Sequence, residues 1–363
     1  MSLALALGRR GLGRVWPNPA VGCVIVREGR IVGRGRTADG GRPHAETVAL
    51  AEAGAAAEGA TAYVSLEPCA HHGQTPPCAE ALIAAGVARV VTALEDPDPR
   101  VAGRGHAMLR AAAIAVTTGV MEPEARAGQQ GFLTRVRLGR PMLTLKLAAS
   151  LDGRIATASG ESRWITGPEA RRRVHAMRAT HDAVLVGAGT ARADDPELTV
   201  RGLGPTPMPQ PVPQPVRVVA ARGLDLPRGG KLAKTIAEAP LWLLHGSGAP
   251  SAARADWQAL GARLIVADEG PDGRLDPTAM LAALGQAGLT RVFCEGGGAF
   301  AAALLQAGLV DRLALFTAGA ALGAEGRPAL GSLALDRLEA APRLALESVE
   351  RVGADMLSHW SRR

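Results

Sequence analysis

Aromatic side chains are scarce in this sequence: they make up 3% of its 363 residues, with a single tyrosine, Tyr63. Proteins that bind single-stranded nucleic acid normally stack bases on several aromatic rings, so this composition argues against such a partner. Lysine is also scarce, and nearly all of the basic charge is carried by arginine. The formal net charge of +7 is spread over both halves of the chain without a basic tail. We therefore expect a small anionic substrate and no nucleic acid.

The chain also has few cysteines and no long apolar run. Four cysteines in 363 residues are too few for a disulfide framework, so we expect a reducing, cytoplasmic environment. No segment reaches the roughly 18 uninterrupted apolar residues of a membrane span. Residues 1–14 lack the apolar core of an export signal. We therefore expect no membrane partner.

Hydrophobic residues make up 47% of the chain, enough for a packed core, and the length favours two domains. Strand-like segments alternate with helix-like segments in both halves, which predicts an α/β fold with crossover connections. A turn-forming segment, Arg137–Pro141, separates the two series and places the domains at residues 1–140 and 141–363. The proline-rich segment Gly202–Pro215 lies between two strands of the second series, so we interpret it as a surface loop.

Apolar segments bounded by glycine, proline or aspartate predict the strands, and alanine-rich segments predict the helices. In the first series, strands are expected at Ala20–Val26, Ile31–Gly33, Thr61–Leu66, Val87–Leu94 and Ile114–Thr118. The helices between them are expected at His44–Ala57, Cys78–Ala85 and His106–Ala112. In the second series, strands are expected at Met142–Leu147, Ala183–Val186, Val216–Ala220, Leu241–Leu244, Leu264–Ala267, Arg291–Cys294 and Leu313–Phe316.

One histidine and two cysteines indicate chemistry most clearly. His44 begins a predicted helix and is followed two residues later by Glu46, while Cys69 follows a strand and Cys78 begins the next helix. One imidazole and two thiolates form a three-ligand zinc set that leaves a position for water, whereas structural zinc usually has four protein ligands. Bound zinc lowers the pKa of that water to about 7. His-x-Glu followed by Pro-Cys and a further Cys is typical of zinc-dependent nucleobase deaminases.

The spacing of the two cysteines differs from the general deaminase pattern. Eight residues separate Cys69 from Cys78, so the two cannot lie on one helical turn and the segment between them must loop out and return. Pro76-Pro77 suits a rigid approach to a helix that opens at Cys78. The helix N-terminus is expected to favour the thiolate form of Cys78.

His44-Ala45-Glu46, the segment Pro68–Cys78 and the upstream segment Pro17–Gly22 together resemble the bifunctional pyrimidine deaminase/reductases of riboflavin biosynthesis. The resemblance implies a cytidine-deaminase-like three-layer α/β domain with one zinc ion per chain. It implies that His44, Cys69 and Cys78 are the zinc ligands and that Glu46 is the catalytic proton shuttle. It also implies that Asn18 and His71 contact the substrate. Two positions depart from the family: Arg36-Thr37 replaces a common Trp-His pair, and Gln74 replaces a common basic residue.

The second half has a glycine-rich turn, Glu295–Gly298, between a predicted strand and a predicted helix at Ala299–Gln306. Such turns let backbone N–H groups approach phosphate, but this one lacks the dinucleotide pattern GxGxxG. Lys146 ends an apolar strand, where an ammonium group needs a partner, and Asp152 or Asp194 is the expected candidate. A purely structural ion pair explains Lys146 equally well.

Residues 146–167, 194–201 and 295–305 resemble the reductase half of the same family, whose fold is similar to that of dihydrofolate reductase. This implies that NADPH reduces the ribosyl chain of the deaminated product. The resemblance assigns NADPH binding to Ala148, Trp164, Thr190, Asp194, Gly296, Gly297 and Gly298. It assigns binding of the sugar-phosphate substrate to Ser162, Arg178, Leu198, Arg201 and Glu295. We add Lys146 to these substrate-binding residues. The segment Ala318–Ala320 departs from a common Ala-Pro-Lys.

Two other hypotheses remain open on the sequence. One is a nucleic-acid or free-nucleoside zinc deaminase with a nucleotide-binding C-terminal domain. The other is a non-enzymatic module with structural zinc. We favour the bifunctional enzyme, acting on phosphorylated pyrimidines as a homo-oligomer. Cys23 and Cys294 are expected to be packing residues, and no role is assigned to His175, His181, His245 and His359.

Overall fold

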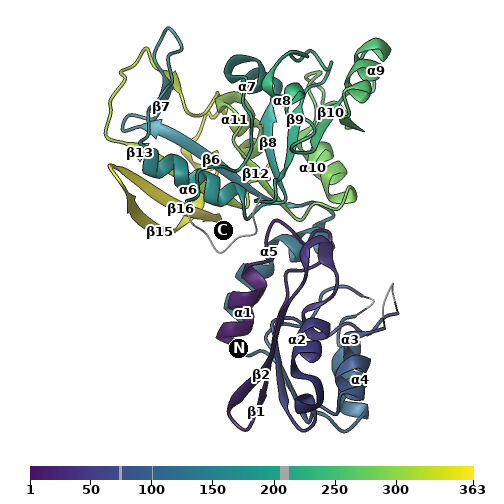
Figure 1. The fold of residues 1–363 in the computed structure, drawn as a ribbon. Helices are drawn as coiled ribbons and strands as arrows, with labels where there is room; N and C mark the ends of the chain where they lie inside the picture. The colour runs from purple at the N-terminus through teal and green to yellow at the C-terminus, as the bar shows by residue number, and fades with distance from the viewer. Residues whose placement is uncertain (73–75, 100, 205–211) are drawn as a thin grey trace. The chain divides into compact units, whose positions relative to one another are not determined.

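The structure, a computed structural model, describes residues 1–72, 76–99, 101–204 and 212–363. Gln74 and residues 205–211 of the proline-rich segment lie outside these ranges, so the surface-loop prediction for that segment stays a prediction. The chain divides into two compact units, Met1–Gly139 and Arg140–Arg363 (Figure 1). The first unit ends with helix α5 (Glu122–Leu138), which Gly139 terminates in the left-handed conformation, φ 68°.

The first unit contains a five-stranded sheet in the order β2-β1-β3-β4-β5. β1 (Gly22–Arg27) and β2 (Arg30–Arg36) form an antiparallel hairpin. Its two-residue turn has positive φ at Glu28 (51°) and Gly29 (73°), as the tightest hairpin turns require. β1 also pairs antiparallel with β3 (Thr61–Val64), and β4 (Arg89–Thr92) and β5 (Ala115–Thr117) continue the sheet in parallel.

Helices cover both faces of this sheet, which gives three layers (Figure 1). α1 (Ser2–Arg9) and α5 lie on one face; α2 (Ala45–Ala53), α3 (Cys78–Ala84) and α4 (Arg104–Ala111) lie on the other. A Cβ atom at Gly22 would lie 1.9 Å from the carbonyl oxygen of Ala4, and one at Gly35 would lie 2.1 Å from that of Ala45. Glycine at these positions therefore lets α1 and α2 approach the sheet closely from its two sides.

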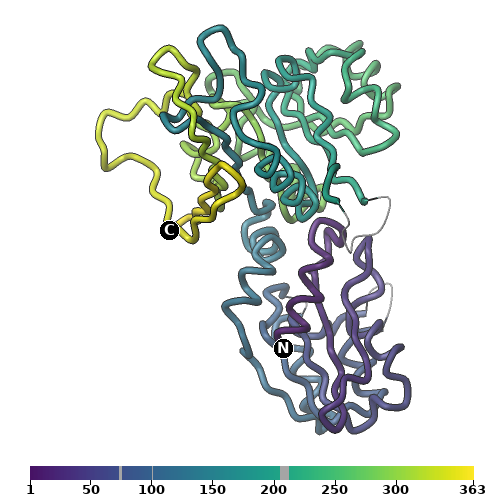
Figure 2. Tube along the Cα trace, turned by 60° about the vertical axis from the view of Figure 1, so that its left-hand side comes forward, coloured from purple at the N-terminus to yellow at the C-terminus, as the bar shows by residue number. Residues whose placement is uncertain are grey.

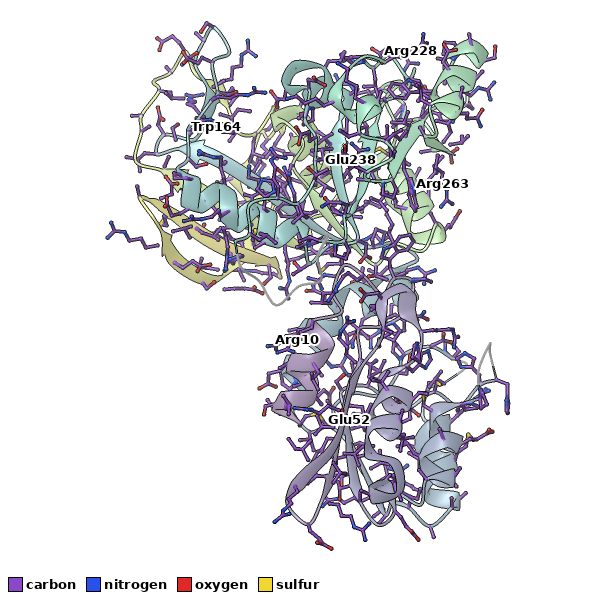
Figure 3. All side chains as sticks on the ribbon, viewed as in Figure 1. Arg10, Glu52, Trp164, Arg228, Glu238 and Arg263 are labelled. Atoms are coloured by element: carbon purple, nitrogen blue, oxygen red, sulfur yellow. The ribbon has the colours of Figure 1, made fainter. Side chains whose placement is uncertain are left out.

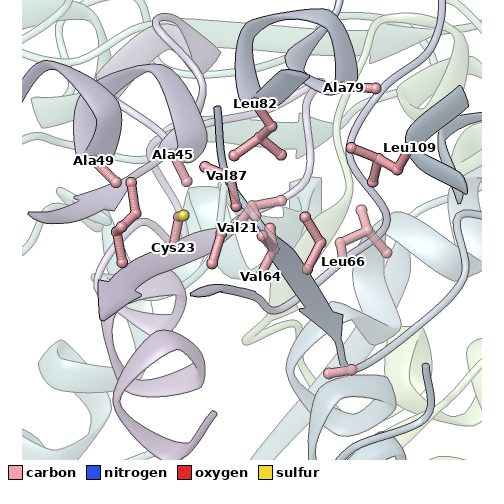
Figure 4. Packing of buried hydrophobic residues seen from close by; sticks show 14 of the residues in the cluster. Val21, Cys23, Ala45, Ala49, Val64, Leu66, Ala79, Leu82, Val87 and Leu109 are labelled. Atoms are coloured by element: carbon pink, nitrogen blue, oxygen red, sulfur yellow. The ribbon is translucent and has the colours of Figure 1, made fainter. Parts of the chain in front are cut away.

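The core of the first unit fills both faces of the sheet, and one part of it lies between the sheet and helices α2 and α3. Cys23 on β1 packs against Ala45 and Ala49 of α2, and Leu82 of α3 lies beside them (Figure 4). Most of these residues are small, so the N-terminus of α2 is held close to the strand ends. This closeness positions the residues that begin α2 and α3.

The second unit is built on a nine-stranded sheet in the order β11-β10-β9-β8-β12-β6-β13-β16-β15. The strands from β11 to β13 are parallel, and β16 and β15 add an antiparallel hairpin at one edge, yellow in Figure 2. The strands are β6 (Met142–Ser150), β8 (Ala183–Gly187), β9 (Val216–Ala220), β10 (Leu241–His245), β11 (Arg263–Val266), β12 (Arg291–Cys294), β13 (Arg312–Ala318), β15 (Leu344–Val352) and β16 (Asp355–Arg362).

The helices of the second unit follow the parallel strands, as crossover connections require. They are α6 (Pro168–Arg178), α7 (Ala188–Asp194), α8 (Lys231–Lys234), α9 (Ser251–Ala259), α10 (Pro277–Gln286) and α11 (Gly298–Gln306). A two-stranded ribbon pairs β7 (Arg154–Ala156) with β14 (Arg327–Pro328). In the described ranges, no helix is long and apolar enough to cross a bilayer.

The predicted strands are found within one to three residues of their expected bounds, but other elements differ from the predictions. The helix expected over His44–Ala57 ends at Ala53, because Gly54 leaves the helical conformation (φ 53°) and a short 3₁₀ turn follows. α1, α5 and the β15–β16 hairpin have no predicted counterpart. Of the 17 residues of α5, only Ala125, Gln129, Gly131 and Leu133 are buried, so its apolar periodicity is weak.

Candidate functional site

The three predicted zinc ligands come together at the edge of the first sheet. His44 is the N-cap of α2, Cys69 lies in the loop after β3, and Cys78 is the first residue of α3. His44 Nδ1 lies 3.3 Å from Cys78 Sγ and 3.6 Å from Cys69 Sγ. Tetrahedral zinc bonds of about 2.0 Å to nitrogen and about 2.3 Å to sulfur place such atoms about 3.5 Å apart. The residues therefore fit a zinc ion.

The two thiols of this site are unequal. The Cys78 backbone N–H donates to Cys69 Sγ over 3.2 Å. A hydrogen bond from the Cys78 thiol, with those from His44 and from this N–H, lowers the pKa of Cys69 to about 4. The same Cys69 contact and burial raise the pKa of Cys78. The N–H of Cys78 at the start of α3 thus points to Cys69, and the predicted effect of the helix N-terminus on the Cys78 thiolate stays a prediction.

Glu46 lies in the first turn of α2 and is only 3% exposed. Burial, assisted by the negative charge of Cys69, raises its pKa to about 7. A carboxyl group with a pKa near neutrality both accepts and donates a proton at physiological pH. Glu46 thus has the properties of a general acid and base next to the zinc ligands.

The two predicted substrate contacts of the first unit are held differently. Asn18 Nδ2 donates to the Gly41 carbonyl over 3.3 Å. Thr37 fixes the segment after Asn18, since its Oγ1 donates to the Pro19 carbonyl and accepts from the Val21 N–H, both over 3.0 Å. The buried Nδ1 of His71 has no hydrogen-bond partner in the described ranges. Buried polar atoms are normally paired, so this nitrogen indicates a ligand position.

In the second unit, Arg178 on α6 forms a bidentate ion pair with Glu295, which follows β12. Arg178 Nε lies 2.5 Å from Glu295 Oε1, and Arg178 Nη2 lies 3.1 Å from Oε2. The third contact of this guanidinium is a 2.8 Å hydrogen bond to the Thr199 carbonyl. The charge and hydrogen bonds of Arg178 overcome the effect of burial and lower the pKa of Glu295.

Lys146 lies near this pair on β6. Burial lowers the pKa of Lys146, and the carboxylate that opposes this shift most strongly is Glu295, with a smaller effect from Asp194. Asp152 instead accepts hydrogen bonds from the backbone N–H groups of Leu322 and Gly323. Of the two predicted partners of Lys146, Asp194 therefore contributes and Asp152 does not, while the stronger partner, Glu295, was not predicted.

The glycine-rich turn lies beside the start of α7. The Gly297 N–H donates to Thr190 Oγ1 over 3.0 Å. A Cβ atom at Gly296 would lie 2.4 Å from the Phe300 ring, and one at Gly298 would lie 3.0 Å from two carbonyl oxygens. A side chain at Gly296 or Gly298 would therefore crowd Phe300 or two backbone carbonyls. The turn lies at the N-terminus of α11, where phosphate binds favourably.

The remaining predicted residues of the second unit differ in exposure and in their contacts. Leu198 is 3% exposed and packs in the apolar cluster, so only its backbone is available to a substrate. Arg201 pairs with Glu197 over 3.1 Å at the surface. Trp164 is 68% exposed, and the Arg171 guanidinium lies 4.5 Å from its ring centroid (Figure 3). Ala148 and Ser162 are half-buried, and Asp194 is exposed.

The sequence analysis missed His175. Its Nδ1 lies 3.1 Å from the Thr199 carbonyl and accepts from the Arg201 N–H over 3.3 Å. Burial, with the charges of Arg178 and Arg201, lowers its pKa to about 4. Because His175 and Arg178 are three residues apart on α6, they lie on one helix face and both hold the segment that contains Thr199. That spacing was the available signal in the sequence. Cys23 and Cys294 are buried free thiols, which confirms their interpretation as packing residues.

Comparisons with known proteins extend these observations. The family described as the cytidine and deoxycytidylate deaminase zinc-binding region matches residues 1–94, and the RibD C-terminal domain matches residues 141–358. The riboflavin biosynthesis protein RibD of Escherichia coli (strain K12) is 43% identical, over 99% of this chain and 97% of that protein. RibD of Aquifex aeolicus (strain VF5) is 38% identical, over 100% of this chain and 97% of its own length.

Two solved structures are similar over the whole chain. RibD of Acinetobacter baumannii has a TM-score of 0.89 and 38% sequence identity. A diaminohydroxyphosphoribosylaminopyrimidine deaminase/5-amino-6-(5-phosphoribosylamino)uracil reductase of Thermotoga maritima has a TM-score of 0.85 and 32% identity. Each comparison covers 100% of this chain and 97% of the other.

Proposed function

The chain belongs to the RibD family, and from this premise we propose which of its residues perform the two reactions. It is a bifunctional enzyme of riboflavin biosynthesis, with a zinc-dependent deaminase half and an NADPH-dependent reductase half. This confirms the predicted fold class, the predicted enzyme class and both predicted cofactors. The alternative of a nucleic-acid or nucleoside deaminase is not favoured, because the relatives match both halves of the chain.

We assign deamination to residues 1–140 and reduction to residues 141–363. The substrates in our proposal are the phosphorylated pyrimidines that the Thermotoga maritima protein is named for. The first half removes an amino group from 2,5-diamino-6-ribosylamino-pyrimidinone 5′-phosphate. The second half reduces the ribosyl chain of 5-amino-6-(5-phosphoribosylamino)uracil to the ribityl product. The convergence of three zinc ligands beside a buried carboxyl group carries this proposal for the first half.

In the deaminase half, His44, Cys69 and Cys78 hold zinc through one nitrogen and two sulfurs. Zinc, when bound, acidifies a water molecule and thereby supplies the nucleophile. Glu46 accepts a proton and returns it to the amino group, which leaves as ammonia when the ring C–N bond breaks. Asn18 and His71 orient the pyrimidine, a role supported by the buried Nδ1 of His71, which has no hydrogen-bond partner among the residues that the structure describes.

In the reductase half, the turn Gly296–Gly298 at the N-terminus of α11 and the hydroxyl of Thr190, which accepts the Gly297 N–H, receive the phosphates of NADPH. Ala148, Trp164 and Asp194 complete its binding. NADPH supplies a hydride to the ribosyl C1′ atom. The substrate is held by Lys146, Ser162, Arg178, the Leu198 backbone, Arg201 and Glu295. Arginine is suited to this task because its planar fork meets phosphate oxygens with two hydrogen bonds.

We also propose a cytoplasmic location and a homo-oligomeric state. The four cysteines are free thiols, and two of them serve as zinc ligands in our assignment, which suits a reducing compartment. β15 is an edge strand of the nine-stranded sheet, and Leu346 and Val349 on it are exposed. Exposed apolar residues on an edge strand favour pairing with a second copy of the chain. Light scattering on the purified protein measures the oligomeric state.

One experiment tests the assignment of both halves. Metal analysis of the purified protein should give one zinc ion per chain. The diamino substrate should release ammonia when no NADPH is present, and the unreacted diamino substrate itself should not oxidise NADPH. The deaminated intermediate should support NADPH oxidation. A protein that releases ammonia from an oligonucleotide and leaves the pyrimidine nucleotide unchanged contradicts the proposal.

A further inference from the structure

Glu67 is a buried carboxylate, 3% exposed, that lies two residues before the zinc ligand Cys69. Its backbone N–H donates to the Leu94 carbonyl over 2.8 Å. Its side chain accepts hydrogen bonds from three backbone N–H groups in a distant part of the chain. The donors are Asp96 and Gly103, which reach Oε2 over 3.2 and 3.0 Å, and His106, which reaches Oε1 over 3.1 Å.

These contacts fix the start of α4. Gly103 is the N-cap of α4 and has no side chain with which to cap it. The first N–H groups of a helix have no partner within the helix, and a carboxylate there also complements the helix dipole. Glu67 provides both effects from another part of the chain. Charge-assisted hydrogen bonds of this kind are stronger than those between neutral groups.

The first turn of α4 also lies directly against the residue before Cys69. A Cβ atom at Gly105 would lie 2.0 Å from the Pro68 carbonyl oxygen, so only glycine permits this approach. The backbone of Glu67 and Pro68 is thus held by Leu94 on one side and by α4 on the other. Cys69 follows immediately, and its sulfur position depends on this backbone.

The carboxylate is not arranged as a second metal site, although Glu67, Glu95 and His106 have donor atoms within 4.8 Å of one another. The three N–H donors already occupy both oxygens of Glu67. His106 Nε2 lies 2.9 Å from Thr92 Oγ1, and His106 Nδ1 lies 3.7 Å from Glu67 Oε1. A metal ion here would have to displace bonds that hold α4 in place.

We propose that Glu67 is a positioning residue of the deaminase, which sets the geometry of Cys69 at zinc by tying the backbone before it to α4. This inference rests on the proposed zinc deaminase function. Outer partners of metal ligands commonly change metal affinity or activity by about 10- to 100-fold when they are replaced. In Glu67→Gln the amide NH₂ must face one of the three N–H donors, so the backbone before Cys69 has to shift.

The test compares Glu67→Gln with Thr92→Val, which removes the hydrogen bond between Thr92 and His106 but leaves the Glu67 contacts intact. For Glu67→Gln we expect zinc affinity, measured by competition with a chromophoric chelator, to fall about 10- to 100-fold. We expect the thiolate-to-metal and d–d absorption bands of the cobalt(II)-substituted enzyme to shift. The kcat of deamination should fall with little change in KM, and NADPH oxidation should be unchanged. Thr92→Val should retain wild-type spectra and affinity.

Equal cobalt spectra and equal zinc affinity in Glu67→Gln and wild type, with only a lower melting temperature, overturn the proposal. So does a second equivalent of zinc that is lost in Glu67→Gln. Absence of deamination in the wild type would instead refute the proposed function. If Glu67→Gln does not fold, hydrogen exchange of backbone amides in the wild-type chain provides the test. Zinc removal should speed exchange at the amides of Gly103 and His106. Unchanged exchange at these amides refutes the coupling between the zinc site and α4.

Discussion

Arg178 and Glu295 are 117 residues apart in the chain, yet their side chains form a bidentate ion pair with both groups only 11% exposed. The pair joins α6 to the end of β12, at the edge of the sheet where the glycine-rich turn begins. Because Arg178 also binds the Thr199 carbonyl, its fork is fixed in orientation before any substrate arrives. A preorganised guanidinium of this kind loses little freedom on binding an anion.

Arg178→Lys should therefore weaken reduction while retaining the positive charge. Lysine cannot form the two parallel hydrogen bonds to Glu295 or reach Thr199 at the same time. We expect the KM for the ribosyl substrate to rise at least tenfold and the free energy of unfolding to fall by about 2 kcal/mol. Steady-state kinetics and denaturant titration measure the two effects. Arg172→Lys, on the exposed side of the same helix, is the matched control and should behave like wild type.

Glu46→Gln should separate metal binding from proton transfer. The amide keeps the size of the carboxyl group but cannot accept and return a proton. We expect zinc content to stay at one per chain, ammonia release to fall by about 100-fold or more, and NADPH oxidation on the deaminated substrate to continue. Glu52→Gln on the same helix, where Glu52 is exposed and pairs with Arg34 (Figure 3), is the control. Survival of ammonia release in Glu46→Gln would refute the assigned mechanism.

The zinc ligands could be predicted from the sequence because His44, Cys69 and Cys78 lie where helices begin and a strand ends, and these ends meet at one sheet edge. The hydrogen bond from the Cys78 backbone to Cys69 Sγ could not, because it depends on the direction of one backbone N–H. The contacts of Glu67 could not be predicted from the sequence either. Its partners are backbone groups 29 to 39 residues away, and the sequence of those residues carries no sign of them.

In the second unit, too, the strands could be predicted from the sequence pattern, whereas the side-chain contacts could not. Its parallel strands could be predicted because they are apolar and buried on both faces. The orientation of Leu198 could not, since an apolar residue in a charged segment is compatible with either a core or a substrate contact. The main partner of Lys146 was also missed, because Glu295 reaches it from the neighbouring strand β12 rather than from the residues that follow β6.

Removal of zinc should abolish one reaction and spare the other. The ligands belong to residues 44–78, and the groups that we assign to reduction lie between residues 146 and 298. After treatment with a chelator, ammonia release should be lost, while NADPH oxidation should continue when deaminated substrate is supplied. Readdition of zinc should restore deamination. Loss of both activities in a chelated protein with an unchanged circular dichroism spectrum contradicts independent sites.

The stability of the second unit should fall in mild acid because of His181. Its ring is buried, with Nδ1 2.7 Å from the Met177 carbonyl and Nε2 3.0 Å from Thr144 Oγ1. Burial, with the charge of Arg291, lowers the pKa of His181 to about 3. The unfolded chain binds this proton near pH 6.5, so it holds more protons than the folded chain between about pH 6.5 and pH 3. The contribution of His181 is therefore complete above about pH 6.5 and declines as the pH falls, by about 2 kcal/mol at pH 5.

Denaturant titrations of wild type and His181→Gln across pH 5 to 8 measure this decline. Glutamine does not titrate, so the variant should lose less stability than wild type between pH 6.5 and pH 5, even if it is less stable at pH 8. Parallel pH profiles for wild type and His181→Gln would show that His181 takes up its proton at the same pH in the folded and in the unfolded chain. In that case its ring would have to donate to both neighbours, and Thr144 would have to accept rather than donate at Nε2.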